Sequence, residues 1–162
     1  MPIEFYRVGD EYGAFSNFSS HPVRLDGKVW PTSEHYFQAQ KFVGTGNDGY
    51  VEEVRKANGP MLAALLGRSR KVKLRRDWES VKDAVMRRAV LAKFEQHDDI
   101  RDLLLGTGDE PLVEATTDDH YWGIGTRGTG RNRLGQILAE VRTTLRERVA
   151  DPSRTTGARR GK

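Results

Sequence analysis

Three polar side chains recur along one side of a helix that the sequence predicts within WPTSEHYFQAQKF, residues 30–42. Glu34, Gln38 and Lys41 are spaced i, i+4 and i+7, so at about 100° per residue they stack on one side. If a cleft desolvated them, the pKa of Glu34 would rise and that of Lys41 would fall, favouring acid–base and nucleophilic roles. Gln38 could then bind a sugar hydroxyl. The alternative is that these three side chains lie on a solvent-exposed helix face and have no functional role. This segment alone fits both interpretations.

Aromatic residues border this polar stripe on both edges. Phe37 lies on one edge and Phe42 on the other, whereas Tyr36, Ala39 and Val43 fall in the opposite sector and are expected to face the core. A solvated helix face seldom carries an aromatic residue on each edge. The pattern therefore favours partial cover of the stripe by another part of the protein.

A glycine-rich segment, DHYWGIGTRGTGRNRLG at residues 119–135, is a second candidate. Gly123, Gly125 and Gly128 match GxGxxG by letter. A dinucleotide-binding fold would place this motif between a strand and a helix, which is not the pattern here, so we reject that interpretation. The glycines still let backbone N–H groups approach an anion closely.

The side chains of the same segment suit a phosphorylated ligand that carries a base. Arg131 and Arg133 stand near the expected start of a helix, where a phosphate is favoured. Tyr121 and Trp122 could stack on a base. The alternative is a flexible surface loop.

Two further segments carry residues that could bind a ligand. In Phe15-Ser16-Asn17-Phe18, Asn17 could bind a hydroxyl or an amide, although a structural turn is the simpler interpretation. Residues 68–76, RSRKVKLRR, hold six cations in nine positions and could attract phosphate or form a solvated basic loop. The four histidines have no spacing typical of metal sites, so no metal is expected.

The bulk properties favour a cytoplasmic globular protein. The chain has 162 residues, of which 36% are hydrophobic, and it contains no cysteine, which excludes disulfides and thiolate chemistry. No apolar run reaches the roughly 20 residues of a membrane span, and nothing at the N-terminus suggests secretion. Residues 151–162 carry +3 of the net charge of +4, so the basicity lies mainly in a tail that we expect to be disordered.

The hydrophobic patterns predict one α+β domain over residues 1–150, mainly helical, with a small antiparallel sheet. Strands are expected near residues 3–7 and 112–115, with a hairpin over 23–30 around the Asp26-Gly27 turn pair. These strands do not alternate regularly with helices, which argues against a doubly wound sheet. Helices are expected over residues 33–43, 50–57, 61–66 and 78–96, from 98 or 99 to 105, and over 134–149.

Four segments together resemble the NADAR or YbiA-like family of N-glycosidases. They are FSNF at 15–18, WPTSEHYFQAQKF at 30–42, DWESVKDAVMRRA with KFEQH within 77–97, and DDHYWGIGTRGTGRNRLG at 118–135. The similarity extends from about Phe5 to Glu147, nearly the whole predicted domain. The sequence departs little from the family's pattern. Asp118 stands where several relatives are expected to have Asn, and positions 124, 126, 127 and 129 vary. These differences bear on which leaving group is accepted.

The resemblance implies hydrolysis of an N-glycosidic bond between a phosphorylated ribosyl group and a base, with no metal or organic cofactor. Two substrate classes are associated with the family: riboflavin-pathway intermediates, which join a ribose phosphate to an aminopyrimidine, and ADP-ribose attached to guanine in nucleic acid. The expected partner is therefore a small-molecule phosphoribosyl substrate or ADP-ribosylated nucleic acid, and not a membrane. The sequence carries no signal for an oligomeric state. The alternative hypothesis is a non-catalytic module that binds ADP-ribose or nucleic acid through residues 68–76 and the tail.

Three positions match the family's charged residues and are assigned to catalysis. Glu34 is assigned to the sugar, as a charge stabiliser or a base that activates water. Lys41 is assigned to attack on the anomeric carbon through a Schiff base, or to electrostatic help. Asp119 is assigned as a second acid or base, or as a ligand of a hydroxyl.

The remaining expected site residues bind substrate. Aromatic side chains would form the walls, amides would bind hydroxyls, and the glycines with Arg133 would hold the phosphate. The full set is Ser16, Asn17, Phe18, Gln38, Trp78, Tyr121, Trp122, Gly123, Gly125, Asn132 and Arg133.

Overall fold

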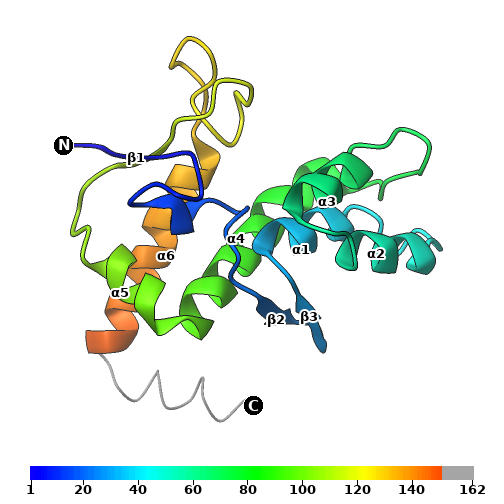
Figure 1. The fold of residues 1–162 in the computed structure, drawn as a ribbon, viewed down its shortest axis with the longest axis horizontal. Coiled ribbons are helices and arrows are strands. Elements are labelled where there is room, and N and C mark those ends of the chain that lie inside the picture. The colour runs from blue at the N-terminus through cyan, green and yellow to red at the C-terminus, as the bar shows by residue number, and fades with distance from the viewer. Residues whose placement is uncertain (151–162) are drawn as a thin grey trace.

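The computed structural model describes residues 1–150 and confirms a mainly helical α+β fold (Figure 1). The tail predicted at residues 151–162 lies outside the described residues. Among residues 1–150, no helix is long and apolar enough to cross a bilayer. The elements are β1 (Ile3–Phe5), the 3₁₀ helix η1 (Gly13–Phe15), β2 (Val23–Leu25), β3 (Lys28–Trp30), α1 (Ser33–Gln40), α2 (Asp48–Arg55), α3 (Pro60–Gly67), α4 (Trp78–Gln96), α5 (Asp98–Leu105), β4 (Leu112–Glu114) and α6 (Arg133–Ala150).

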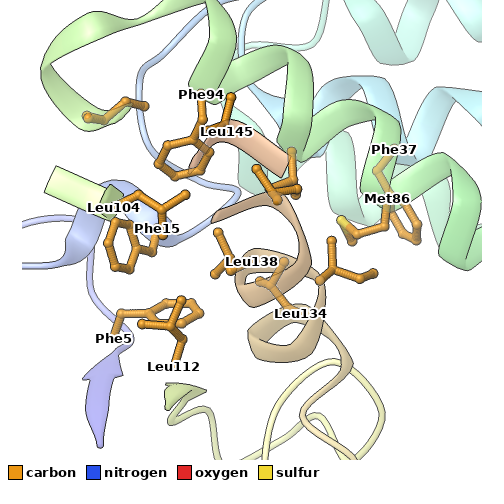
Figure 2. Close-up of a cluster of buried hydrophobic side chains, with 14 of the residues drawn as sticks. Phe5, Phe15, Phe37, Met86, Phe94, Leu104, Leu112, Leu134, Leu138 and Leu145 are labelled. Carbon is orange, nitrogen blue, oxygen red and sulfur yellow. The ribbon is translucent and has the colours of Figure 1, made fainter. Parts of the chain in front are cut away.

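The longest helix, α4, lies between two hydrophobic clusters and belongs to both. Met86, Val90 and Phe94 join it to α5, α6 and the strands β1 and β4 (Figure 2). Ala89 joins it to α1, α2, α3 and β3. Figure 1 shows the result: α1, α2 and α3 lie on one side of α4, and α5 and α6 lie on the other. Because α4 spans both clusters, it sets the position of α1 relative to the segments around β4 and α6.

The strands form two separate pairs instead of one sheet. β2 and β3 pair antiparallel, as the hairpin pattern predicts. The turn residues Asp26 and Gly27 have φ values of 56° and 76°, as in a type I′ turn. β1 and β4 instead pair in parallel, with Ile3 opposite Leu112. The sequence does not predict this pair, because no local pattern relates two strands so far apart in the chain.

α1 begins at Ser33 as predicted but ends before the predicted residue. Thr32 is the N-cap, and its hydroxyl accepts a hydrogen bond from the N–H of His35 at 3.1 Å. The helix ends at Gln40 and not at Val43, because the N–H groups of residues 41–43 bond to carbonyls three residues back. Val43, expected in the core, is instead 38% exposed. All eight residues of α1 are buried and Lys41, directly after it, is half-buried, so the polar stripe is not a solvated face.

A buried lysine of α4 holds the loop that meets the start of α1. Lys93 is 1% exposed, and its Nζ donates hydrogen bonds to the carbonyls of Ala14 and Ser16 at 2.5 and 2.8 Å. Burial lowers the pKa of Lys93 from 10.5 to about 7. The position of this loop therefore depends on an amine that changes its charge near neutral pH.

Lys93 should make the stability of the protein depend on pH. Between pH 7 and 10.5 the unfolded chain holds a proton on Lys93 that the folded chain has lost, so this residue makes the free energy of unfolding rise with pH. The Lys93→Met variant lacks this contribution. We expect the difference in unfolding free energy, wild type minus variant, to increase by about 2 kcal/mol from pH 7 to pH 9 in urea denaturation. The contributions of the other titrating groups are the same in both proteins and cancel in this difference. If the difference in unfolding free energy did not change with pH, the lowered pKa of Lys93 would be contradicted.

Candidate active site

Glu34 is a buried carboxyl in the first turn of α1. Its exposed fraction is 7%, and its N–H donates to the carbonyl of Asn17 at 3.2 Å. Its Oε2 accepts a hydrogen bond from Nε2 of Gln38 at 2.7 Å. Burial raises the pKa of Glu34, and the charge of Asp119 adds to the rise, whereas the Gln38 bond and two nearby cations oppose it. A carboxyl with a raised pKa suits a group that holds or accepts a proton during a reaction.

Gln38 contacts Glu34 and α3, whereas the sequence analysis expects it to bind a sugar hydroxyl. Its Nε2 donates to Glu34, and within the described residues its Oε1 is buried without a hydrogen-bond partner. That oxygen faces the Cα of Gly67, the last residue of α3. A Cβ on Gly67 would lie 2.1 Å from Gln38 Oε1 and 2.8 Å from Gln38 Cβ. The close approach of α3 therefore requires a glycine at position 67 and holds Gln38 against Glu34.

Lys41 directly follows α1, about 10 Å from Glu34 along the helix axis. Its Nζ donates to the carbonyl of Gly67 at 3.3 Å and lies 5.9 and 6.0 Å from the ring centroids of Phe37 and Trp78. Burial lowers the pKa of Lys41, while the charge of Glu34 opposes that shift. The shift is in the direction that the sequence analysis predicts for a desolvated amine, and it favours the neutral, nucleophilic form.

An aromatic cluster forms one wall of the site. Phe37 contacts Trp78 of α4 and Trp122 of the glycine-rich segment, with ring centroids 5.1 and 5.3 Å apart. The structure thus brings the two expected tryptophan walls together around a residue of α1. Phe42 packs elsewhere, against Tyr50 in the second hydrophobic cluster. The polar stripe therefore has an aromatic edge at the site on the Phe37 side only.

The loop before the hairpin meets the start of α1. The backbone carbonyl of Asn17 accepts the N–H of Glu34, and its Oδ1 accepts the hydroxyl of Ser33 at 2.8 Å. The Ser16 hydroxyl accepts the N–H of Phe18 at 3.1 Å, which shapes the turn. Phe18 itself is only partly buried. Asn17 and Ser16 therefore position other groups, and Phe18 keeps an accessible ring surface.

Two further carboxyls lie within electrostatic reach of Glu34. Oδ1 of Asp119 accepts the N–H groups of Tyr121 and Trp122 at 2.9 and 2.8 Å, so this carboxylate also shapes the loop. Glu114, the last residue of β4, is partly buried. Burial raises its pKa to about 8, and the charges of Asp119 and Glu34 add to the rise. Glu114 is not predicted from the sequence, because a single glutamate at the end of a strand matches no motif.

The glycine-rich segment bonds to itself where the sequence predicts a phosphate site. The N–H groups of Arg131, Arg133 and Leu134 donate to the carbonyls of residues 120–122, at 2.8, 2.9 and 3.1 Å. The side chain of Arg133 bonds to Asp83 at 3.2 Å and to Gln136. These contacts use the donors at the start of α6 that an anion would require.

Other expected residues of this segment also have internal partners. Asn132 has a φ of 52°. Its Oδ1 accepts a hydrogen bond from the N–H of Glu114, and its Nδ2 donates one to the carbonyl of Leu112, both at 2.9 Å. A Cβ on Gly123 would lie 2.2 Å from the Thr116 side chain, and one on Gly125 would lie 2.2 Å from the His120 ring. Asn132 and these glycines therefore allow the loop to pack closely on itself and on β4.

The ring of Tyr121 lies between charged groups. Nζ of Lys82 is 3.9 Å from the ring centroid, and the guanidinium of Arg131 is 5.2 Å from it. The Tyr121 hydroxyl donates to Asp83. Two cations therefore lie over the ring on which the sequence analysis expects a base to stack.

Ring contacts and electrostatic interactions link Glu34, Lys41, Trp78, Trp122 and Asp119, and Glu114 interacts with Glu34 and Asp119. Among residues 1–150, no three His, Asp or Glu side chains gather closely enough to hold a metal ion. The chemistry that the grouped residues offer is proton transfer, attack by an amine and stacking of a ring.

Residues 4–146 match the model of the NADAR domain. The chain belongs to the NADAR family. It is 55% identical over 143 residues to N-glycosidase YbiA of Escherichia coli (strain K12), covering 88% of each chain. The NMR structure of the E. coli protein YbiA matches with a TM-score of 0.85 at 53% identity, over 93% of this chain and 88% of that one.

Two other relatives extend the NADAR comparison. N-glycosidase Npun_R5314 of Nostoc punctiforme is 49% identical over 146 residues, covering 90% of this chain and 94% of that protein. Riboflavin biosynthesis protein PYRR, chloroplastic, of Zea mays is 42% identical over 155 residues, covering 88% of this chain but 25% of the maize protein. The maize protein therefore contains a NADAR-like segment within a much longer chain.

The contact between Gly67 and Gln38 can be tested in this NADAR protein with a matched pair of variants. Gly67→Ala would force Gln38 away and so release Glu34, and we expect it to lower kcat/KM for N-glycoside hydrolysis by about 100-fold. Gly49→Ala is the control, because a Cβ there meets nothing within 4 Å, and in α2 it should stabilise the fold by about 0.5 kcal/mol. Steady-state kinetics and thermal unfolding measure both effects. Equal activity of the two variants would show that Gln38 does not position Glu34.

Proposed function

We propose that this chain is an N-glycosidase that hydrolyses the bond between a phosphoribosyl or ADP-ribosyl group and a base. One observation carries the proposal: burial raises the pKa of Glu34 and lowers that of Lys41 on the same side of α1. A carboxyl that can hold a proton and a neutral amine are thus available to one substrate. The wall of Phe37, Trp78 and Trp122 supports stacking of a ring beside them. The names of the E. coli and Nostoc relatives support the reaction type.

The proposed reaction begins with attack by Lys41 on the anomeric carbon. A bond forms between Nζ and this carbon while the glycosidic C–N bond breaks, and its electron pair leaves with the base. Glu114, which is protonated below about pH 8, donates the proton that the departing base requires. Glu34 stabilises the positive charge that develops on the sugar. Burial keeps Glu114 protonated by raising its pKa, and the negative charge of Asp119 adds to this effect.

Water completes the proposed reaction. The lysine adduct gives up a proton to Glu34, and Glu34 passes this proton to the ring oxygen as the sugar ring opens to a Schiff base. Glu34, again a carboxylate, then removes a proton from the water that attacks the Schiff base. The C–N bond to Lys41 breaks as Glu34 returns that proton to Nζ and the new hydroxyl gives its proton to Glu114, which releases the free sugar and restores the amine and both carboxyl groups. The overall change is the addition of one water molecule across the glycosidic bond.

Ribosylaminopyrimidine phosphates of riboflavin biosynthesis are the substrates to test first. The name of the maize relative supports this choice. ADP-ribosylated guanine in nucleic acid is the second substrate class, and it shares with the first a ribose joined through nitrogen to a base. Binding of either compound without release of its base would favour the alternative of a non-catalytic binding module.

Release of the free base tests the proposed activity. We expect wild type to release base from at least one of the two substrate classes. Glu34→Gln and Glu114→Gln should each lower kcat by about 100-fold or more, because each removes a group that transfers a proton. Glu53→Gln, which changes an exposed glutamate of α2, is the matched control and should retain full activity. Equal activity of Glu34→Gln and Glu53→Gln would show that Glu34 does not take part in catalysis, and the proposed active site would then be wrong.

Borohydride separates the two roles proposed for Lys41. If its amine forms a Schiff base, reduction during turnover should attach the sugar covalently to the peptide that contains Lys41, as detected by mass spectrometry. Lys41→Arg keeps a positive charge without a nucleophilic amine and should abolish both the adduct and the activity. An unlabelled Lys41 together with an active Lys41→Arg variant would leave only an electrostatic role.

A further inference from the structure

A basic cavity lies directly beside the amine of Lys41. It has a volume of about 650 Å³ and is lined mainly by residues of the segment that connects α3 to α4. Its lining includes Lys41, Gly67, Arg68, Arg70 and Lys73. The cavity is open to solvent, and four of the five residues named are cations or, in Lys41, a group that can become one.

Both ends of this segment are attached to the last turn of the proposed catalytic helix. At its start, Gly67 packs on Gln38 and accepts a hydrogen bond from Lys41 Nζ at 3.3 Å. At its end, the N–H of Arg75 donates to the backbone carbonyl of Lys41 at 2.8 Å. The cavity is therefore held in a defined position next to the reactive amine, at the opposite end of the polar stripe from Glu34.

Within the described residues, three cations of the cavity form no ion pair with a carboxylate. Among residues 1–150, no ion pair involves Arg68, Arg70 or Lys73, whereas Arg75 at the end of the same segment pairs with Asp77 at 2.6 Å. Like charges held close together repel one another, and an anion between them removes that repulsion. Arg68 also acts on the site, because its charge lowers the pKa of both Glu34 and Lys41.

We propose that the cavity bounded by Lys41, Arg68, Arg70 and Lys73 is the phosphate subsite, and that it selects N-ribosides that carry a phosphate on the ribose. The inference rests on the proposed function and deepens it. The start of α6 does not offer this subsite, since Arg133 and the nearby N–H groups are bonded within the protein. With phosphate at the Lys41 end of the stripe, the ribose lies along the stripe toward Glu34. The base then faces the wall that contains Trp122.

A matched pair of double variants tests the subsite. Arg70→Gln/Lys73→Gln removes two cations of the cavity without changing Glu34, Lys41 or Glu114. Arg24→Gln/Lys56→Gln removes the same charge from the hairpin and from the end of α2. We expect the first variant to weaken binding of ribose 5-phosphate, measured by isothermal titration calorimetry, by about tenfold or more, and the control to change it less than twofold.

Kinetics provide a second measurement. The ratio of kcat/KM for a phosphorylated riboside to that for the same riboside without phosphate should fall about tenfold in Arg70→Gln/Lys73→Gln, mainly through KM. This ratio should not change in Arg24→Gln/Lys56→Gln. An equal loss in both double variants, or an unchanged ratio in the cavity variant, would overturn the proposal. Circular dichroism confirms that all variants remain folded.

The calorimetric measurement also separates failure of this inference from failure of the proposed function. If wild type cleaves no riboside but binds ribose 5-phosphate through Arg70 and Lys73, the subsite stands and the proposed activity fails. If wild type cleaves ribosides with and without phosphate equally well, the activity stands and the subsite is overturned. Binding of single-stranded DNA, but not of ribose 5-phosphate, through the same cations would assign the cavity to nucleic acid and overturn the small-molecule subsite.

Discussion

The complete burial of α1 is the constraint on which the site depends. A helix that buries all eight residues must place its polar side chains against other elements, and Asn17 and Gly67 provide such contacts. Removal from water raises the pKa of Glu34 and lowers that of Lys41, so one physical cause prepares both groups. Burying the carboxyl of Glu34 and the amine of Lys41 costs free energy of folding. The packing of the rest of the domain must therefore stabilise the elements around them.

α4 provides much of that support. Its first residue, Trp78, contacts Phe37 at the site, and Lys93 near its other end holds the loop that meets α1. Between these points the helix packs into both hydrophobic clusters, which joins the half of the domain around α1 to the half around α6 (Figures 1 and 2). The carboxyl groups of Glu114 and Asp119 come from the second half. Phe37 of α1 also packs in the cluster around α6 and contacts Trp122 directly, so α4 and this contact together bring the residues of the proposed reaction close to one another.

Several glycines of this protein serve packing more than ligand binding. Gly67 allows α3 to approach Gln38, and Gly123 allows the glycine-rich segment to approach Thr116. Several N–H groups of the same segment donate to its own carbonyls, and the proposed phosphate subsite uses side chains of another segment instead. Arg68, Arg70 and Lys73, between α3 and α4, form no ion pair with a carboxylate of residues 1–150 and line a pocket together with Lys41, so they are available to bind an anion.

Local patterns in the sequence determined the elements and the order of chemical groups along α1. The helix at Trp78–Gln96 has its predicted ends, the Asp26-Gly27 pair forms the predicted turn, and helical periodicity alone places Glu34 and Lys41 on one side. The early end of α1 at Gln40, the parallel pairing of β1 with β4 and the contribution of Glu114 required the tertiary structure. Each of these depends on contacts between segments distant in the chain, which no local pattern records. The sequence by itself determined which groups recur along the stripe, and only the packing decided that they are buried, because desolvation is set by the neighbours around a side chain.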